Sequence, residues 1–256
     1  MDSADFEARM RRLEYFHGVR TLPGAWVVIR VDGRSFTRLT AARFEKPFDP
    51  AFHELMVGTA RALLEDLHGL YAYTESDEIS ILFPPGWDLF DREVEKLVSI
   101  SASVASAAFS LASQAVAHFD SRIWMGAERQ QVVDYFRWRQ ADAERCGLNG
   151  WCHWMLVKAG KSAVEANAIL AGKSVGLKNE LLFQHGVNFN DLPVWQRRGT
   201  GLHWERQEKP GFNPKEGRAV VTTRRRLRVD EGLPMKDAYA AFIQGLLDTV
   251  DVDQVN

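Results

Sequence analysis

The sequence predicts an α+β fold built on a split βαββαβ antiparallel sheet with helices, followed by a C-terminal extension of helices and strands. Short runs that are β-branched or that alternate apolar with smaller or polar residues are typical of strands, and they occupy residues 26–31, 71–83 and 119–125. Residues 49–69 and 91–118 carry apolar residues at helical spacing. Because the run at 71–83 has two arms around a bend, the order is strand, helix, two strands, helix, strand, which is the order of a split βαβ sheet.

Each element of the first half has its own local signal. Residues 5–19 place apolar residues at helical spacing among charges, which predicts an amphipathic helix before the first strand. Residues 34–48 are basic and aromatic and close with a proline, so we expect a loop there. The Asp-Pro pair at 49–50 is typical of an N-cap followed by a first-turn proline, and Gly69 marks the end of that helix. The Pro-Pro-Gly segment at 84–86 ends the second arm of the hairpin.

The second half is less regular. A helix is expected from about Glu128, with an interruption at 146–150, where two glycines and an asparagine fall close together. Residues 162–165 have the spacing of a capping box and start a short helix. We therefore divide the chain into a core, residues 1–140, and an extension packed on it, residues 141–256.

The extension also contains two expected strands. They cover residues 200–206 and 218–229, and the Pro- and Gly-containing segment 207–214 is interpreted as a mobile loop between them. A final helix is expected over residues 236–247. The polar residues after it are expected to be disordered.

Composition and charge limit the compartment and the partners. The chain has 256 residues, of which 46% are apolar, and a formal net charge of −2, which does not by itself indicate a protein that binds polyanions. The acidic N-terminus lacks a signal-peptide pattern and no membrane-spanning segment is visible, so we expect a cytoplasmic protein that does not bind membranes. Cys146 and Cys152 fit neither a redox pair nor a short zinc spacing, which favours two free thiols in a reducing compartment.

Two carboxylates stand at the ends of predicted strands. Asp32 follows the strand 26–31, and Asp77 lies at the bend of the hairpin, 45 positions later. Gly33 allows a sharp turn after Asp32, and the backbone amides that follow suit a phosphate group. Carboxylates held by a sheet at neighbouring strand ends can hold two divalent ions and a nucleoside triphosphate. The alternative is that Asp-Gly and Ser-Asp-Glu are ordinary turn signals.

Positive charge is concentrated in the C-terminal third. Arg224, Arg225 and Arg226 follow one another in a predicted strand, and Arg197 and Arg198 form a second pair. The two interpretations of this segment, a contact with a phosphate backbone and a solvated strand face, both remain open at this point.

Several motifs, taken together in their order and spacing, resemble one family. They are Arg30-Val-Asp-Gly-Arg-Ser-Phe36, Lys46-Pro47, Glu75-Ser-Asp-Glu78, Phe119-Asp-Ser-Arg122, Trp138-Arg-Gln-Ala-Asp142, Lys178-Asn-Glu180 and Val187-Asn-Phe-Asn190. The chain from about residue 6 to residue 229 is similar to the tRNA-His guanylyltransferases and to their relatives, the 3′-to-5′ polymerase-like tRNA repair proteins. The resemblance implies a palm-like catalytic core and an extension that binds RNA and forms oligomers.

The resemblance also implies roles for individual residues. Asp32, the Gly33 carbonyl and Asp77 would bind two Mg²⁺ ions, and Glu78 would add negative charge to this catalytic centre. The residues implied to hold the nucleotide are Gly33, Arg34, Ser35, Phe36, Thr37, Lys46, Ser76 and Asp77. The residues implied to contact RNA or a second nucleotide are Lys178, Asn179 and Asn188, with Arg139 and Asp142. For Arg139 and Asp142, a salt-bridged helix face is an equal alternative.

The implied activity is the template-dependent addition of nucleotides to the 5′ end of truncated tRNA, after activation of the 5′-phosphate by ATP, with GTP as a further substrate. Enzymes specific for tRNA-His carry His-Ile-Asn-Asn where this chain has Glu144-Arg-Cys-Gly147, which favours the repair-type relatives. The resemblance further implies a homotetramer. The alternatives are a tRNA-His-specific guanylyltransferase, a nucleotidyl cyclase with a similar palm, and an RNA-binding module without catalysis.

Overall fold

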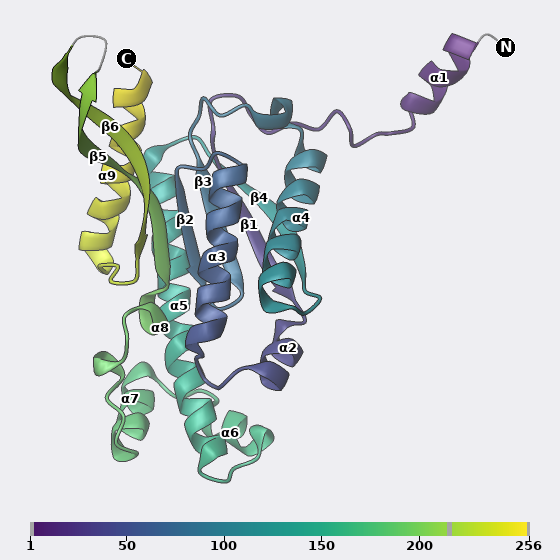
Figure 1. Ribbon diagram of the computed structural model, residues 1–256. Helices are drawn as coiled ribbons and strands as arrows, with labels where there is room; N and C mark the ends of the chain where they lie inside the picture. The colour runs from purple at the N-terminus through teal and green to yellow at the C-terminus, as the bar shows by residue number, and fades with distance from the viewer. Residues whose placement is uncertain (1–2, 214–216, 255–256) are drawn as a thin grey trace.

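The protein is built around one antiparallel sheet with helices on both faces (Figure 1). The computed structural model describes residues 3–213 and 217–254. The strands lie in the order β4-β1-β3-β2-β5-β6. Their bounds are β1 Trp26–Arg34, β2 Tyr71–Glu75, β3 Glu78–Phe83, β4 His118–Gly126, β5 Thr200–Asn213 and β6 Arg218–Asp230. The α+β class and the split βαββαβ order of the first half are confirmed.

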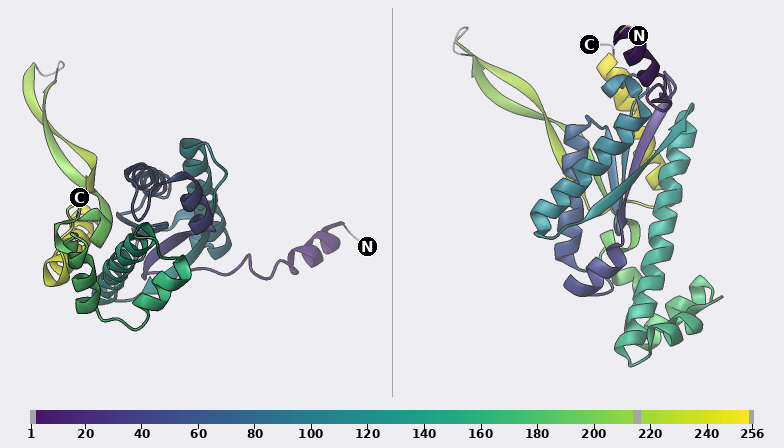
Figure 2. Two further views of the ribbon diagram at one scale, coloured as in Figure 1. Left: turned by 90° about the horizontal axis from the view of Figure 1, so that it is seen from below. Right: turned by 90° about the vertical axis from the view of Figure 1, so that its right-hand side faces the viewer.

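The helices divide between the two faces of the sheet (Figure 2). Their bounds are α1 Ser3–Arg11, α2 Phe36–Arg43, α3 Pro50–Asp66, α4 Val94–Ser113, α5 Arg129–Lys158, α6 Ala163–Leu170, α7 Val175–Gln184, α8 Trp195–Arg198 and α9 Lys236–Gln254, with 3-10 turns η1 Leu89–Arg92 and η2 Phe189–Asp191. Helices α3 and α4 pack on one face, and α5 and α9 pack on the other. Helices α6, α7 and α8 gather around the C-terminal half of α5.

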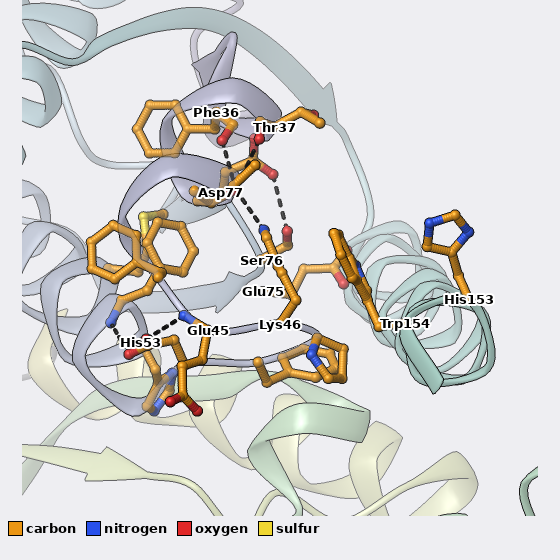
Figure 3. A pocket seen from close by; sticks show the side chains of 18 of the residues that line it. Phe36, Thr37, Glu45, Lys46, His53, Glu75, Ser76, Asp77, His153 and Trp154 are labelled. Atoms are coloured by element: carbon orange, nitrogen blue, oxygen red, sulfur yellow. Dashed lines mark hydrogen bonds between the residues drawn. The ribbon is translucent and has the colours of Figure 1, made fainter. Parts of the chain in front are cut away.

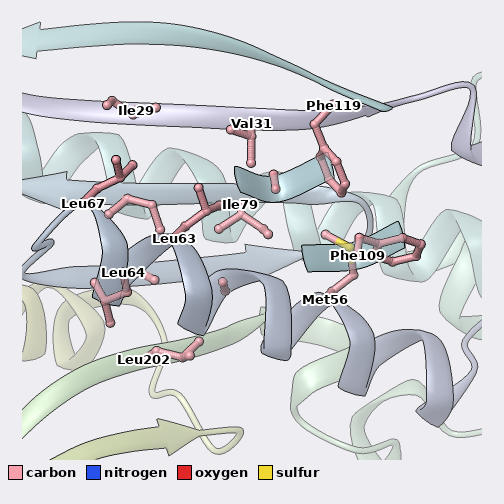
Figure 4. Close-up of a cluster of buried hydrophobic side chains, with 14 of the residues drawn as sticks. Ile29, Val31, Met56, Leu63, Leu64, Leu67, Ile79, Phe109, Phe119 and Leu202 are labelled. Atoms are coloured by element: carbon pink, nitrogen blue, oxygen red, sulfur yellow. The ribbon is translucent and has the colours of Figure 1, made fainter. Parts of the chain in front are cut away.

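Alternation along β1 explains how one strand serves two cores. Val27, Ile29 and Val31 join the cluster under α3 and α4, which Figure 4 shows together with residues of these helices. Trp26 and Val28 join the cluster under α5 and α9. Successive side chains of a strand point to opposite faces, so an apolar run of this kind is buried on both sides.

Helix α3 begins as its sequence predicts. The side chain of Asp49 accepts hydrogen bonds from the backbone amides of Ala51 (2.7 Å) and Phe52 (3.3 Å), and Pro50 occupies the first turn. These bonds satisfy donors that a helix N-terminus otherwise leaves unpaired. The expected capping box at Ser162 and Glu165 is also present at the start of α6.

Two predictions for the N-terminal part were wrong. The segment 34–48 is not all loop, because it contains α2, whose Phe36 and Thr40 are buried while its arginines are exposed. The helix expected over 5–19 ends at Arg11. Helix α1 stands away from the body of the protein (Figure 1), so its apolar residues gain little support from tertiary packing.

Two predictions for the extension were also wrong. Helix α5 continues without interruption through 146–150, and β5 continues through most of the predicted loop, to Asn213. Residues 207–213 pair with β6 in a ribbon that projects from the sheet (Figure 2). Pro210 is tolerated there because β6 is the only strand beside it among the described residues. Position 214 lies outside the described residues.

The division between core and extension does not follow the layers of the fold. Residue 140 falls inside α5, and β5 and β6 from the extension complete the same sheet as the core strands. The final helix is longer than expected: α9 continues past residue 247 to Gln254, and the last two residues of the tail lie outside the described residues.

Helix α4 has the length and apolar composition that would suit a membrane-spanning helix, and it is the one such helix in the described ranges. The sequence interpretation had not singled it out. In this structure Leu97, Ala105 and Phe109 of α4 are buried against the sheet and α3.

The continuity of α5 gives a matched pair of glycine substitutions. A Cβ at Gly147 would stand 2.6 Å from the backbone oxygen of Gln196 in α8, whereas a Cβ at Gly150 would meet nothing within 4 Å. Gly150→Ala should raise the free energy of unfolding by about 0.5–1 kcal/mol through helix propensity. Gly147→Ala should lower it by about 1–3 kcal/mol because α8 must move. Urea denaturation of the two variants measures both effects, and a stabilised Gly147→Ala variant would contradict this packing.

Candidate active site

Four carboxylates lie in one row across the sheet. In the strand register Asp32 of β1 pairs with Asp120 of β4 on one side and with Glu78 of β3 on the other, and Glu78 pairs in turn with Glu75 of β2. Directly opposed residues of antiparallel strands point to the same face. The row therefore faces the α5 side of the sheet, at the end where β1 leads into α2. Like charges placed opposite one another destabilise a sheet, so the row requires compensation.

The tip of the β2–β3 hairpin brings Asp77 to this row. Ser76 and Asp77 form the turn between the paired residues Glu75 and Glu78, and Ser76 has a left-handed backbone with φ 47°. The Gly33 amide donates a hydrogen bond of 3.0 Å to the Asp77 carbonyl oxygen, which ties the turn to the end of β1. The Ser76 hydroxyl donates to Asp77 Oδ1 at 3.1 Å. The structure thus places Asp32 and Asp77 at one end of the sheet, as the sequence predicts.

The environment of Asp77 disfavours its charged form in the absence of cations. Burial, followed by the neighbouring carboxylate of Asp32, raises the pKa of Asp77, and hydrogen bonds from its own backbone amide and from Ser76 oppose this rise. A group whose ionisation costs free energy in the folded protein gains from a cation nearby. Carboxylate and carbonyl oxygens are the ligands that Mg²⁺ prefers, so Asp32, Asp77 and the Gly33 carbonyl fit such an ion by their chemistry.

Apart from Asp32, the carboxylates of the row, Glu75, Glu78 and Asp120, form hydrogen bonds with arginines. Arg139 of α5 donates to both oxygens of Glu78, at 2.7 and 2.9 Å, and to Glu75 Oε1 at 3.1 Å. Arg122 donates to Asp120 at 2.8 Å, and the same Nη2 atom lies 3.9 Å from Asp32 Oδ2. Burial, and then the charge of Glu78, raises the pKa of Glu75 to about 8, although Arg139 lowers it.

A cavity of about 450 Å³ opens beside the hairpin tip (Figure 3). Its lining includes Ser76 and Asp77 from the hairpin, Thr37 from α2, and Lys46 from the segment between α2 and α3. Aromatic side chains form much of the remaining wall: Phe44, Phe48, Phe52, Trp154 and Trp195. Ligand pockets in proteins commonly have this size and this combination of apolar wall and few polar groups.

Lys46 brings a positive charge to the cavity. Its Nζ donates to the Thr40 hydroxyl at 2.6 Å. Burial lowers the pKa of Lys46, and the carboxylates of Asp77 and Asp49 raise it. Lys46 and Asp77 line the same cavity, an arrangement that suits a polyphosphate bound between the ammonium group and the hairpin tip.

Family models match both halves of the chain. Residues 7–127 match the family model described as tRNAHis guanylyltransferase, and residues 130–232 match the model described as Thg1 C terminal domain. A probable tRNA(His) guanylyltransferase of Mus musculus is 32% identical over 227 residues, which cover 80% of this chain and 76% of that protein.

The chain belongs to the tRNAHis guanylyltransferase family. It is therefore a member of a family of nucleotidyltransferases. Some relatives are much longer, since the chain spans 36% of tRNA(His) guanylyltransferase 2 of Arabidopsis thaliana, with 35% identity over 195 residues.

Two solved structures of bacterial tRNA(His) guanylyltransferase-like proteins share the fold. One is a complex with GTP, has a TM-score of 0.72 and 27% identity, and the match covers 95% of this chain and 99% of that one. The other is a complex with ATP, has a TM-score of 0.73 and 26% identity, and the match covers 94% and 99% of the two chains.

β1 continues through Gly33, where the sequence predicted a sharp turn, and the remaining nucleotide-binding candidates lie at its end and just after it. Arg34 ends β1, and Ser35, with φ 62°, precedes the first turn of α2. The backbone of Phe36 can face a ligand, but its ring is buried among Phe52, Phe109 and Phe119. Phe36 thus anchors α2 in the core, and the predicted amide cradle becomes the N-terminus of a helix.

The RNA-binding candidates lie in three places. Arg139 is buried in an ion-pair network, and the half-buried Asp142 joins this network, with 3.1 Å between Arg139 Nη2 and Asp142 Oδ2. Lys178 donates to Asn149 of α5 at 3.0 Å, Asn179 to the Val175 carbonyl at 3.1 Å, and Asn188 to Asp191 at 2.8 Å, so all three help to shape the lobe of α6 and α7.

The third place is the β5–β6 ribbon. Arg224, Arg225 and Arg226 are exposed there, with the Arg225 guanidinium 4.9 Å from the ring centroid of Trp204. The ribbon points away from the end of the sheet that carries α2 (Figure 1). RNA contacts by these arginines remain a prediction.

Sequence reasoning missed several residues of this site. Glu75 and Asp120 entered only as parts of motifs, and the signal that could have found them is the strand register, which places both in the row of Asp32 and Glu78. The aromatic wall gave no signal at all, because Phe44, Trp154 and Trp195 come from distant segments.

The raised pKa of Asp77 leads us to predict a change in stability toward urea when this residue is replaced. Because burial and Asp32 disfavour the ionised side chain, Asp77→Asn should raise the urea midpoint at pH 7.5 in EDTA. The gain should shrink as the pH falls toward 4, since protonation then removes the same cost from the wild type. Saturating Mg²⁺ should stabilise the wild type and not the variant.

Asp120→Asn is the matched control, because its carboxylate is exposed and paired with Arg122. It should produce no gain in EDTA. A metal-free Asp77→Asn protein that is less stable than the wild type at pH 7.5 would contradict the described environment.

Proposed function

We propose that this chain adds nucleotides in the 3′-to-5′ direction to the 5′ end of truncated tRNA, under the direction of a template base, after ATP has activated the 5′-phosphate. The observation that carries the proposal is the meeting of Asp32 and Asp77 beside a cavity that also contains Lys46. Membership in the family supports nucleotide addition, and the related structures that hold GTP and ATP support nucleoside triphosphates as substrates.

The reaction has two transfer steps. In the first, an oxygen of the tRNA 5′-phosphate attacks the α-phosphorus of ATP, and pyrophosphate leaves. In the second, the 3′-hydroxyl of the incoming nucleotide attacks the activated 5′-phosphorus, loses its proton, and AMP leaves. A tRNA that already carries a 5′-triphosphate would skip the first step and release pyrophosphate in the second. Both steps are in-line displacements at phosphorus, in which positioning and charge stabilisation supply most of the catalysis.

The residues divide this work by position. Asp32, Asp77 and the Gly33 carbonyl would hold two Mg²⁺ ions, which supply activation of the attacking oxygen and stabilisation of the leaving one. Lys46, which lines the cavity, balances the charge of the triphosphate. The aromatic wall excludes water and offers flat surfaces on which a base can stack.

Our preference for 5′-end repair over strict tRNA-His specificity rests on the segment of α5 that differs from His-Ile-Asn-Asn. In the segment Glu144–Gly147 the side chain of Glu144 is exposed, and Arg145 donates to Asp142 at 3.0 Å. Arg145 is thus engaged with Asp142 and is not available to offset the negative charge of Glu144 beside RNA. The names of the curated relatives favour the second candidate, guanosine addition to tRNA-His.

By family resemblance we also propose a homotetramer. Its support in this chain is the N-terminal arm, residues 3–16, which stands away from the body and exposes Phe6, Leu13, Tyr15 and Phe16 (Figure 1). Exposed apolar groups in such number favour an interface. Sedimentation equilibrium that finds a monomer at micromolar concentration would contradict this part of the proposal.

The direct test of the proposed function uses tRNA lacking its first 5′ nucleotide, labelled nucleotides and Mg²⁺. We expect incorporation of the nucleotide complementary to the template base, and slower addition at the extra position of tRNA-His. Asp77→Asn should lower the rate on the order of 100-fold or more, because the loss of a metal ligand removes several kcal/mol of charge stabilisation. Its tRNA affinity should stay within about twofold of wild type, because metal ligands do not anchor the RNA backbone.

Asp66→Asn, an exposed change at the end of α3, is the control and should leave the rate unchanged. Addition only to tRNA-His would favour the second candidate. A cyclic nucleotide formed without RNA would favour a cyclase, and full activity of Asp77→Asn would overturn the metal assignment.

A further inference from the structure

The guanidinium of Arg139 joins the two strands on either side of the catalytic turn. It donates to Glu78, the first residue of β3, and to Glu75, the last residue of β2. The turn formed by Ser76 and Asp77 lies directly between these two residues. Arg139 therefore closes the base of the hairpin tip that carries Asp77, and its planar fork can bind the Glu78 carboxylate through two parallel bonds.

Arg139 is itself held on several sides. Its Nη2 also binds Asp142 at 3.1 Å, and its guanidinium carbon lies 4.5 Å from the ring centroid of Trp138. The residue is 6% exposed. Arg30 also approaches Glu78, but its Nε stays 3.6 Å away and makes no hydrogen bond within the described part of the chain. Arg139, rather than Arg30, is thus the group that fixes Glu78.

This burial decides between the two interpretations of Arg139 left open by the sequence. A phosphate of RNA could reach the guanidinium only if the bonds to Glu75 and Glu78 were broken, which would leave two buried carboxylates unpaired. Leaving a buried charge without its partner is strongly destabilising. A contact with RNA is therefore disfavoured, and a role through the hairpin is favoured.

The ion pairs divide the carboxylates of the row into those that are bonded to an arginine and one that is not. Glu75 and Glu78 are occupied by Arg139, and Asp120 is occupied by Arg122 at 2.8 Å. Asp32 has a long contact of 3.9 Å to the same Arg122, and its side chain is 38% exposed. A divalent ion that enters this end of the sheet thus competes with looser cationic contacts at Asp32 and Asp77, from Arg122 at 3.9 Å and from the charge of Lys46, than at Glu75 and Glu78, which Arg139 holds by hydrogen bonds.

We propose that Arg139 is a positioning residue, which fixes the Ser76–Asp77 turn against β1 and, by occupying Glu75 and Glu78, confines divalent cations to Asp32 and Asp77. This inference rests on the metal site of the proposed function. In this arrangement Glu78 anchors the turn. Arg139 supports metal binding indirectly, by holding the turn, and does not contact RNA.

The test measures Mn²⁺ binding by electron paramagnetic resonance, with full-length protein and without RNA or nucleotide. Arg139→Lys keeps the charge but loses the fork, and we expect about tenfold weaker Mn²⁺ binding, as is usual when a group that orients metal ligands is lost. Arg145→Met is the matched control on the same helix, because Arg145 binds Asp142 and Cys146. It should bind Mn²⁺ within about twofold of wild type.

A second variant covers the case in which Arg139→Lys does not fold. Glu75→Gln/Glu78→Gln/Arg139→Gln replaces the buried ions by amides, Asp142 keeps its bond to Arg145, and Arg30 loses only a 3.6 Å contact with Glu78. It should fold, as judged by its melting temperature, and still bind Mn²⁺ about tenfold more weakly, because the fork that fixes the turn is gone. In all variants the tRNA affinity in EDTA should match that of the wild type.

Three results would overturn the inference. Wild-type Mn²⁺ affinity in the folded Arg139→Lys or triple variant would show that the turn needs no such support. Reduced tRNA affinity with unchanged Mn²⁺ binding would make Arg139 an RNA contact. Equal and negligible Mn²⁺ binding by the wild type and Asp77→Asn would reject the metal site itself. This failure of the proposed function is distinguishable from a failure of the inference about Arg139, because it is seen in proteins that keep Arg139.

Discussion

The structure depends on how the chain accommodates a row of carboxylates at one end of its sheet. Asp120, Asp32, Glu78 and Glu75 stand side by side in register, and Asp77 joins them from the hairpin tip. Such a row is unfavourable for folding unless cations neutralise it. Arginines from β4 and α5 neutralise most of it, and the part that remains is the part that suits divalent ions. The same carboxylates therefore both oppose folding, through their mutual repulsion, and form the candidate site for divalent ions.

The packing around the row explains why this end of the sheet is rigid. Beneath it, α3 and α4 close one face with a continuous apolar cluster, and α5 closes the other (Figures 2 and 4). Phe36 locks the first turn of α2 into the same core directly after β1. Ligands held on strands and on a packed helix keep their geometry better than ligands on long loops.

The sequence was sufficient for features with local causes. The Asp49-Pro50 pair predicts the start of α3, and the alternation of apolar residues predicts the β2–β3 hairpin. The apolar runs next to Asp32 and Asp77 predict that both carboxylates lie at one end of the sheet. The order of the core elements and the carboxylate pair could therefore be predicted. Features that depend on partners distant in the chain could not. Gly147 looked like a helix breaker, whereas it allows α8 to approach α5. Arg139 offered two equal interpretations until its distances to Glu75 and Glu78 were known.

The proposed function requires Asp32 and Asp77 to hold cations for a triphosphate. The most direct measurement is a crystal structure with Mn²⁺ and a non-hydrolysable ATP analogue, in which anomalous scattering locates the metal. The account predicts two peaks about 3.5–4 Å apart, bound to Asp32 and Asp77 and to the phosphates. Peaks on Glu75 or Glu78 with Arg139 displaced, or a bound nucleotide with no metal at Asp32 and Asp77, would contradict it.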